Sequence, residues 1–285
     1  MLRLKLPAHD LAATVNACIA GITGNNKLRL SVNNNTQAIV ALEAQYRGVA
    51  ESVGLATIAA TQNDDVPILG DLTKSDFKKL YHLYFRGEEK AGRKIYDELM
   101  NAAEGGCPYC GGLGSPRNLD HHLPVAHFPQ FSILPFNLVP ACRDCNMDGK
   151  PDNFSTVQSQ QIIQPYLDDS RFFDEQWISG RYIPAQGGQP SRIEYFADPP
   201  ALWSAQDKSR ATRHLVEFGV ADKYAMRAAE VLGVTLQQVQ RLRHSGCTDG
   251  FISHIIFDPG ELGAPFVNHW LTGMHQALRH SVAFL

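Results

Sequence analysis

The spacing of apolar side chains predicts a largely helical chain. Residues 9–60 are rich in alanine, and we expect helical stretches there, with turns at Thr23–Asn26 and at Asn33–Asn35. Thr73 and Asp76 stand three residues apart, as in a capping box, which marks the first turn of a helix. Apolar residues then recur at helical spacing, which predicts a buried aromatic face made of Phe77, Leu80, Tyr81, Tyr84 and Phe85.

Helical spacing returns on both sides of a central segment of different character. A second helix is expected from about Glu88, ending at Gly105-Gly106, with an inward face of Ile95, Tyr96, Leu99, Met100 and Ala103. Residues 184–200 are rich in Gly, Pro and Gln, which favours a loop with one short strand at Ile193–Phe196. The fold class predicted is mainly α, with a helical region at 1–104, a small core at 105–155 and a helical region at 156–285.

The C-terminal region contains two further helix signals. Thr235 and Gln238 repeat the capping-box pattern. The last helix is expected after Pro265, with an inward face of Phe266, Trp270, Met274, Ala277 and Leu278.

Four cysteines in two C-x-x-C pairs dominate the central segment. Cys107 and Cys110 form the first pair, and Cys142 and Cys145 form the second. Four thiolates in this pattern make a structural tetrahedral zinc site. We therefore predict one structural Zn²⁺ here, and we expect the two remaining cysteines, Cys18 and Cys247, to be core thiols without chemistry.

Composition and charge narrow the possible classes of protein. Of the 285 residues, 44% are hydrophobic, and no apolar run approaches the ~18 residues that a membrane span needs. The first residues alternate apolar and basic side chains and lack the pattern of a signal peptide, so we expect a reduced, cytoplasmic setting that suits metal-bound cysteines.

A formal net charge of −3 does not favour nonspecific binding to nucleic acid, so phosphate contacts would need local basic patches. One candidate patch is the interval 208–243. The alternative is that its basic side chains form a solvated helix face. Its basic residues are Lys208, Arg210, Arg213, Lys223, Arg227, Arg241 and Arg243.

A second set of candidate functional residues lies between the cysteine pairs and directly after the second pair. Residues 118–123 suit a strand ended by Pro124, residues 136–139 suit a second strand, and a helix follows Cys142. Asp120 and His121 place a carboxylate beside an imidazole, while Asn137 and Asn146 supply carboxamides. Such a set can hold one hard divalent cation and activate a water molecule on a phosphodiester.

These elements resemble those of HNH, or ββα-metal, endonucleases of the zinc-ribbon type. The matching residues are the two cysteine pairs, Asp120-His121 with Pro124, Asn137-Leu-Val-Pro, and Asn146 after the last cysteine. The resemblance implies that His121 is the general base and that Asn137 orients it. It also implies that Asp120 and Asn146 bind a catalytic Mg²⁺ or Mn²⁺, and that substrate phosphates are contacted by Arg143 and Lys150.

A wider resemblance covers Gly92–Leu99 and Pro165–Asp169, which are similar to segments of PtuB-like HNH nucleases of bacterial anti-phage systems. It implies cleavage of nucleic acid, with DNA favoured over RNA, a role in antiviral defence and an ATPase partner subunit. The chain departs from the pattern at Val125, because relatives often have lysine after the motif proline. This departure puts one phosphate contact in doubt.

The same residues allow other functions to be excluded or kept as alternatives. A zinc deaminase needs H-x-E and P-C-x-x-C, and neither motif is present. A zinc-ribbon module that binds nucleic acid without cleaving it remains an alternative, as does a nuclease fold that only docks a partner. We expect His122 to serve packing, on the strand face opposite His121, and we leave His127 as a possible substrate contact.

Overall fold

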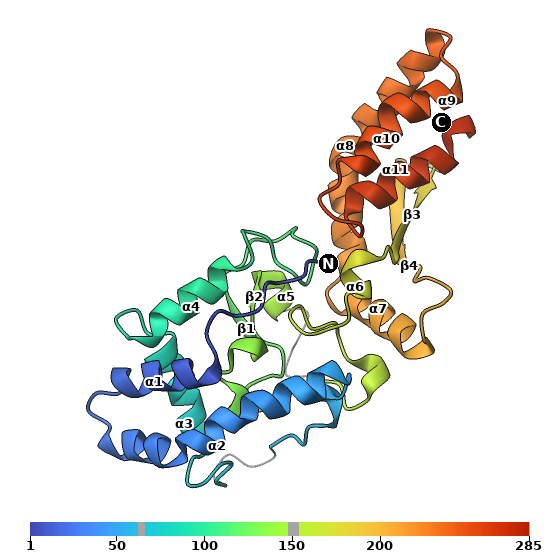
Figure 1. Cartoon of the computed structure of the whole chain (residues 1–285). Helices are drawn as coiled ribbons and strands as arrows, with labels where there is room; N and C mark the ends of the chain where they lie inside the picture. Colours follow the sequence, from blue (N-terminus) through green and yellow to red (C-terminus); the bar gives the residue numbers. More distant parts are fainter. Residues whose placement is uncertain (62–65, 148–153, 285) are drawn as a thin grey trace. The chain divides into compact units, whose positions relative to one another are not determined.

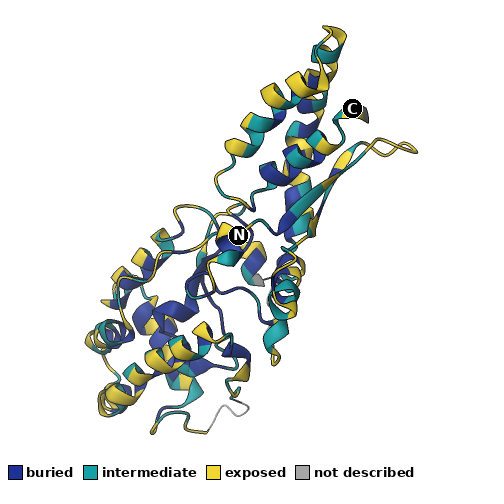
Figure 2. Cartoon of the chain, turned by 45° about the vertical axis from the view of Figure 1, so that its right-hand side comes forward, coloured by how far each residue is buried: buried dark blue, intermediate teal, exposed yellow. Residues whose placement is uncertain are grey.

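The computed structural model describes residues 1–61, 66–147 and 154–284, and the chain separates into two compact units (Figure 1). One unit comprises Arg3–Asp168, and the other comprises Asp169–Leu285 together with Met1–Leu2. The N-terminal helices and the four-cysteine segment therefore belong to the same unit. Buried residues gather inside each unit (Figure 2).

Helices make up the N-terminal part of the first unit. They are α1 (Leu11–Gly21), α2 (Asn26–Glu51), α3 (Lys74–Lys79) and α4 (Gly92–Asn101), with a π-helical segment η2 (Leu80–Phe85) continuing α3. The turn predicted at Asn33–Asn35 is wrong, because α2 runs through it. Its apolar face, which includes Val32 and Ile39, is buried, and Asn35 donates hydrogen bonds to Ser31 O and Asp71 Oδ1.

The aromatic helix face is confirmed. Thr73 and Asp76 form the predicted capping box at the start of α3. All five aromatic or leucine side chains predicted to face inward from Phe77 to Phe85 are buried. The next helix begins at Gly92 rather than near Glu88, and Met100 is half-buried where burial was expected.

The central segment has the predicted order of strand, strand and helix. Strand β1 (Asn118–His121) pairs antiparallel with β2 (Leu138–Ala141), with Asp120 opposite Val139. The second strand begins two residues later than predicted, because Pro135–Asn137 form a short 3₁₀ turn. Helix α5 (Arg143–Met147) follows directly after Cys142.

The second unit packs helices around a β-hairpin. The hairpin joins β3 (Ile178–Ile183) to β4 (Arg192–Ala197). Its helices are α6 (Arg171–Asp174), α7 (Ala205–Glu217), α8 (Val220–His244), α9 (Asp249–Ile252), α10 (Asp258–Leu262) and α11 (Trp270–His280). The strand predicted at 193–196 is confirmed, whereas its partner β3 was not predicted.

Two predictions for this unit are wrong in detail. Thr235 does not cap a helix, because it lies inside α8 and its hydroxyl donates to Val231 O. The last helix begins at Trp270 rather than just after Pro265, so Phe266 precedes it and is half-buried. Among the described residues, no helix combines the length and apolar character needed to cross a membrane.

Four of the seven basic residues in the interval 208–243 are buried or paired with acidic side chains. Arg210 is fully buried, with its guanidinium over the Phe172 ring. Three other arginines have acidic partners, in the pairs Arg213–Glu217, Arg227–Glu230 and Arg243–Asp249. These side chains stabilise the helices, which favours the structural interpretation of the interval.

Candidate metal centre

The four cysteines form one compact, buried cluster. Their sulfur atoms lie within 4.8 Å of one another, and the Sγ atoms of Cys110 and Cys142 are 4.0 Å apart. A tetrahedral zinc with Zn–S bonds of ~2.3 Å places its sulfur ligands about 3.8 Å apart. The geometry therefore fits a four-thiolate zinc ion, with Cys107 and Cys145 completing the set.

Tight backbone turns hold the first cysteine pair. Cys107 N–H donates to Gly114 O at 2.8 Å, and Gly114 N–H donates to Cys110 Sγ at 3.4 Å. A Cβ at position 114 would lie 2.5 Å from the Cβ and Sγ of Cys142. Glycine at this position therefore allows the first cysteine turn to approach the second closely.

The electrostatics of the cluster call for a cation. Hydrogen bonding from Cys107 lowers the pKa of Cys142, while hydrogen bonding with Cys107 raises the pKa of Cys145. The sulfur atoms thus compete for negative charge when no ion is bound. A divalent cation allows all four buried thiols to ionise together, because it compensates their mutual repulsion.

His121 is buried on β1 with a defined orientation. Its Nε2 lies 2.9 Å from Ser132 O, and its ring meets the edge of Tyr81 with centroids 4.4 Å apart. A carbonyl oxygen only accepts hydrogen bonds, so Nε2 carries the proton of the neutral ring. The remaining nitrogen, Nδ1, then has the lone pair, as a general base requires.

Asn137 holds the loop that joins the two strands. The residue is fully buried, and its Oδ1 accepts from Leu123 N–H at 2.7 Å and from Tyr46 Oη at 3.2 Å. Its Nδ2 donates to Leu123 O at 3.1 Å and to Phe131 O at 3.2 Å. Asn137 and His121 thus contact adjacent residues of the same turn, because Ser132, which accepts from His121, follows Phe131 directly.

The neighbouring histidines have structural contacts. His122 follows His121 in the chain, and its Nδ1 lies 3.3 Å from Tyr109 Oη in the first cysteine turn. This bond joins the strand to the metal centre. The His127 ring packs on Phe154, with centroids 4.8 Å apart.

The remaining predicted site residues are Asp120, Asn146, Arg143 and Lys150. Asp120 is buried on β1, where its charge adds to burial in raising the pKa of Tyr81. Asn146 is half-buried in α5, one residue after Cys145, and Arg143 is exposed. Lys150 lies outside the described residues. The sequence did not reveal Tyr81, Ser132 or Tyr46 as supports of the site, because no local motif marks them.

Comparison with known proteins identifies a phage relative. No protein-family model and no solved structure matches the chain. Protein ea31 of Escherichia phage lambda is 33% identical over 301 aligned residues, which cover 100% of this chain and 99% of that protein. The chain therefore belongs to the family of phage lambda protein ea31.

Proposed function

We propose that this protein is a metal-dependent endonuclease that hydrolyses phosphodiester bonds of nucleic acid. The observation that carries the proposal is the contact between His121 and Ser132. Nε2 of His121 lies 2.9 Å from Ser132 O, which assigns the proton to Nε2 and the lone pair of the neutral ring to Nδ1. The strand that bears it is anchored through His122 and Tyr109 to the four-cysteine centre.

The proposed chemistry assigns one task to each side chain. Nδ1 of His121 accepts a proton from the attacking water molecule. Asp120 and Asn146 would provide oxygen ligands for Mg²⁺ or Mn²⁺, and the bound ion would supply electrostatic stabilisation of the phosphate and of the leaving oxygen. Arg143 is exposed and available to contact phosphate, and Lys150 keeps the same proposed role. The zinc ion is structural and separate.

The proposed substrate is DNA, with RNA as the second possibility. A net charge of −3 indicates weak binding by the chain alone, so we propose that a partner, an ATPase subunit, delivers or directs the substrate. The proposal keeps the role expected from the resemblance, that of the effector nuclease of a bacterial anti-phage defence system.

A non-catalytic role is the second candidate. Within the described residues, the four cysteines are the one group of three or more His, Cys, Asp or Glu side chains close enough to hold an ion. That observation alone favours a zinc-ribbon module that binds nucleic acid or docks a partner. Such a module needs the cysteines and does not need Asp120, His121 or Asn146.

The test compares His121→Ala with a matched histidine variant. Plasmid, single-stranded DNA and tRNA are incubated with pure protein, with and without Mg²⁺ or Mn²⁺. Loss of a general base lowers the rate ~10²–10⁴-fold, so His121→Ala should cleave that much more slowly while its zinc content stays unchanged. His254→Ala, which removes an exposed histidine of the second unit, should cleave like the wild type. Equal cleavage by His121→Ala, or none by the wild type with any metal, would refute the nuclease proposal.

A further inference from the structure

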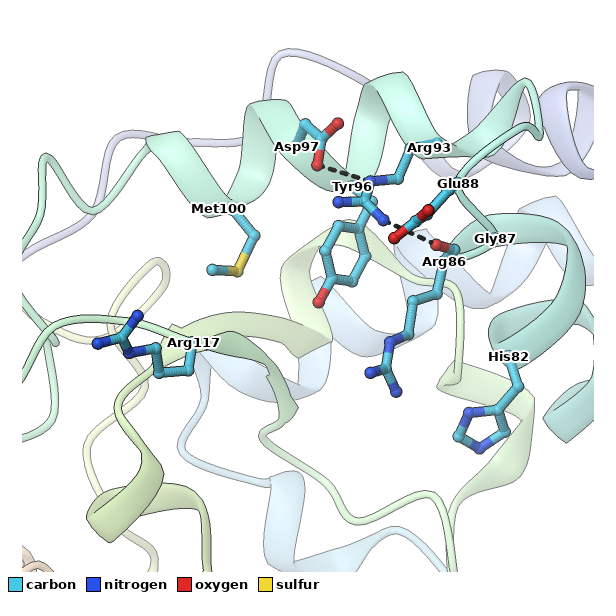
Figure 3. Close-up of a pocket in the computed structure, with 9 residues that line it drawn as sticks. All are labelled: His82, Arg86, Gly87, Glu88, Arg93, Tyr96, Asp97, Met100 and Arg117. Carbon is cyan, nitrogen blue, oxygen red and sulfur yellow. Dashed lines mark hydrogen bonds and ion pairs between the residues drawn. The ribbon is translucent and has the colours of Figure 1, made fainter.

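A basic pocket lies beside the strand that carries His121. It has a volume of about 500 Å³ and opens between η2, α4 and the residue before β1 (Figure 3). The pocket is lined by His82, Arg86, Gly87, Glu88, Arg93, Tyr96, Asp97, Met100 and Arg117. All of these residues belong to the first unit, and no sequence motif joins them.

The charges of the pocket leave an excess of one positive charge. The lining contains three arginines and two carboxylates, Glu88 and Asp97. Arg93 is occupied, because it donates to Asp97 at 2.7 Å and to Arg86 O at 3.2 Å. Within the described parts of the chain, neither Arg86 nor Arg117 has a carboxylate partner. Burial, and then the charge of Arg86, lowers the pKa of His82, which keeps that ring neutral at pH 7.

Hydrogen bonds tie the pocket to the proposed catalytic strand. Arg117 N–H donates to Ala141 O at 2.8 Å, so its backbone extends the pairing of β1 with β2. Leu119 N–H donates to Tyr96 Oη at 3.4 Å, and Leu119 O accepts from Tyr81 Oη at 3.0 Å. Arg117 and His121 are four residues apart in extended chain, so they share one face and lie ~13 Å apart.

The pocket is suited to phosphate rather than to bases. Its one large ring, Tyr96, is only 5% exposed and lies between Arg86 and Arg117 (Figure 3), so it offers no surface for stacking. Guanidinium groups without a carboxylate partner are good donors to phosphate oxygens. A single excess charge matches the single negative charge of a phosphodiester better than the several charges of a nucleoside triphosphate.

We propose that Arg86 and Arg117 bind a backbone phosphate of the nucleic-acid strand, close to the strand that carries His121. The inference rests on the proposed nuclease function, and it adds a substrate-binding site on the N-terminal helices. It also explains how a chain of net charge −3 can hold nucleic acid, because the contact is made by two positioned arginines.

The test measures binding of fluorescent single-stranded and duplex oligonucleotides to the full chain carrying His121→Ala, which prevents cleavage. The affinity for each oligonucleotide is measured between 50 mM and 200 mM salt. The measurement is repeated with Arg86→Gln, Arg117→Gln or both as further substitutions in the same protein. The one phosphate that the two arginines bind contributes ~0.9 to the slope of log K against log [salt] for duplex DNA and ~0.7 for single strands. The double variant Arg86→Gln/Arg117→Gln should lose about that much slope and each single variant a part of it, equally for all sequences. Arg29→Gln, an exposed arginine on α2, is the control and should change nothing.

The outcomes separate this inference from the nuclease proposal. An unchanged salt slope in both pocket variants overturns the inference, even if His121→Ala abolishes cleavage. Pocket-dependent binding without cleavage by the wild type supports the inference and removes the nuclease proposal.

The same variants are tested with fluorescent ATP and with inorganic phosphate as competitor. If ATP binding is lost in the variants while oligonucleotide binding is unchanged or never occurs, the pocket holds a nucleotide and the inference is wrong. Absence of any binding also overturns it.

Discussion

Replacement of Asn137 by alanine should weaken the loop that supports His121 without unfolding the chain. The side chain makes four hydrogen bonds, to Leu123 N–H, Leu123 O, Phe131 O and Tyr46 Oη. Asn137 is fully buried, and Leu123 and Phe131 are 5% and 0% exposed. Solvent therefore cannot replace the lost partner without opening the loop.

The expected destabilisation follows from these four bonds. A buried hydrogen bond contributes about 1 kcal/mol net, so Asn137→Ala should cost about 4 kcal/mol. Domains of this size are stable by about 5–15 kcal/mol, so the variant should remain folded. Tyr46→Phe removes one of the four bonds and should cost about 1 kcal/mol. Cleavage should fall in both variants in the same order, because Ser132 lies in the supported loop.

Hydrogen exchange measured by mass spectrometry is the suitable assay. Tryptophan fluorescence reports only on the second unit, which contains all three tryptophans, Trp177, Trp203 and Trp270. Peptides covering residues 118–141 should exchange faster, with the logarithm of the rate rising in proportion to the free energy lost, while peptides of the second unit stay unchanged. If Asn137→Ala opens these peptides by less than about 1 kcal/mol, the hydrogen bonds do not hold the loop, and the argument for Asn137 is wrong.

Two further predictions concern the metal centre and pH. Cys142→Ser should reduce the zinc content from about one ion per chain to none, as measured by elemental analysis. Gly114→Ala should lower the affinity for zinc, because its Cβ would lie 2.5 Å from Cys142. Gly48→Ala is the control, because the space around Gly48 is open, and it should bind zinc normally. Burial lowers the pKa of His269 from 6.5 to about 4, so the folded state binds fewer protons than the unfolded state. The stability of the protein should therefore fall as the pH drops from 6.5 to 4. His269→Asn, which can still accept a hydrogen bond from Leu271 N–H, should reduce that loss in urea titrations followed by tryptophan fluorescence.

Local signals predicted local structure well. The capping box at Thr73 and the aromatic spacing after it depend on neighbours within two helical turns, so they could be found without knowledge of the fold. The same signal failed at Thr235, where the chain is already helical and the hydroxyl bonds to Val231 O instead. A four-residue motif does not show whether the residues before it already belong to a helix.

Structure that depends on distant partners was missed. β3 contains Gly180, which weakens its strand pattern, yet a Cβ there would lie 2.5 Å from Gly273 O of α11. Glycine is therefore needed for the close approach of α11, which no short window of sequence reveals. The basic pocket was missed for the same reason, because Arg86 and Arg117 are brought together by η2, α4 and β1 rather than by a motif.

The contacts of β1 indicate why a structural metal would lie beside the strand that is proposed to be catalytic. The strand is only four residues long, and it pairs with one other short strand. An isolated two-stranded hairpin is at best marginally stable in water. Tyr81 and Tyr96 fix Leu119 from one side, and Tyr109 fixes His122 from the first cysteine turn. Zinc would thus contribute to activity by restraining the strand that holds His121, without touching the substrate.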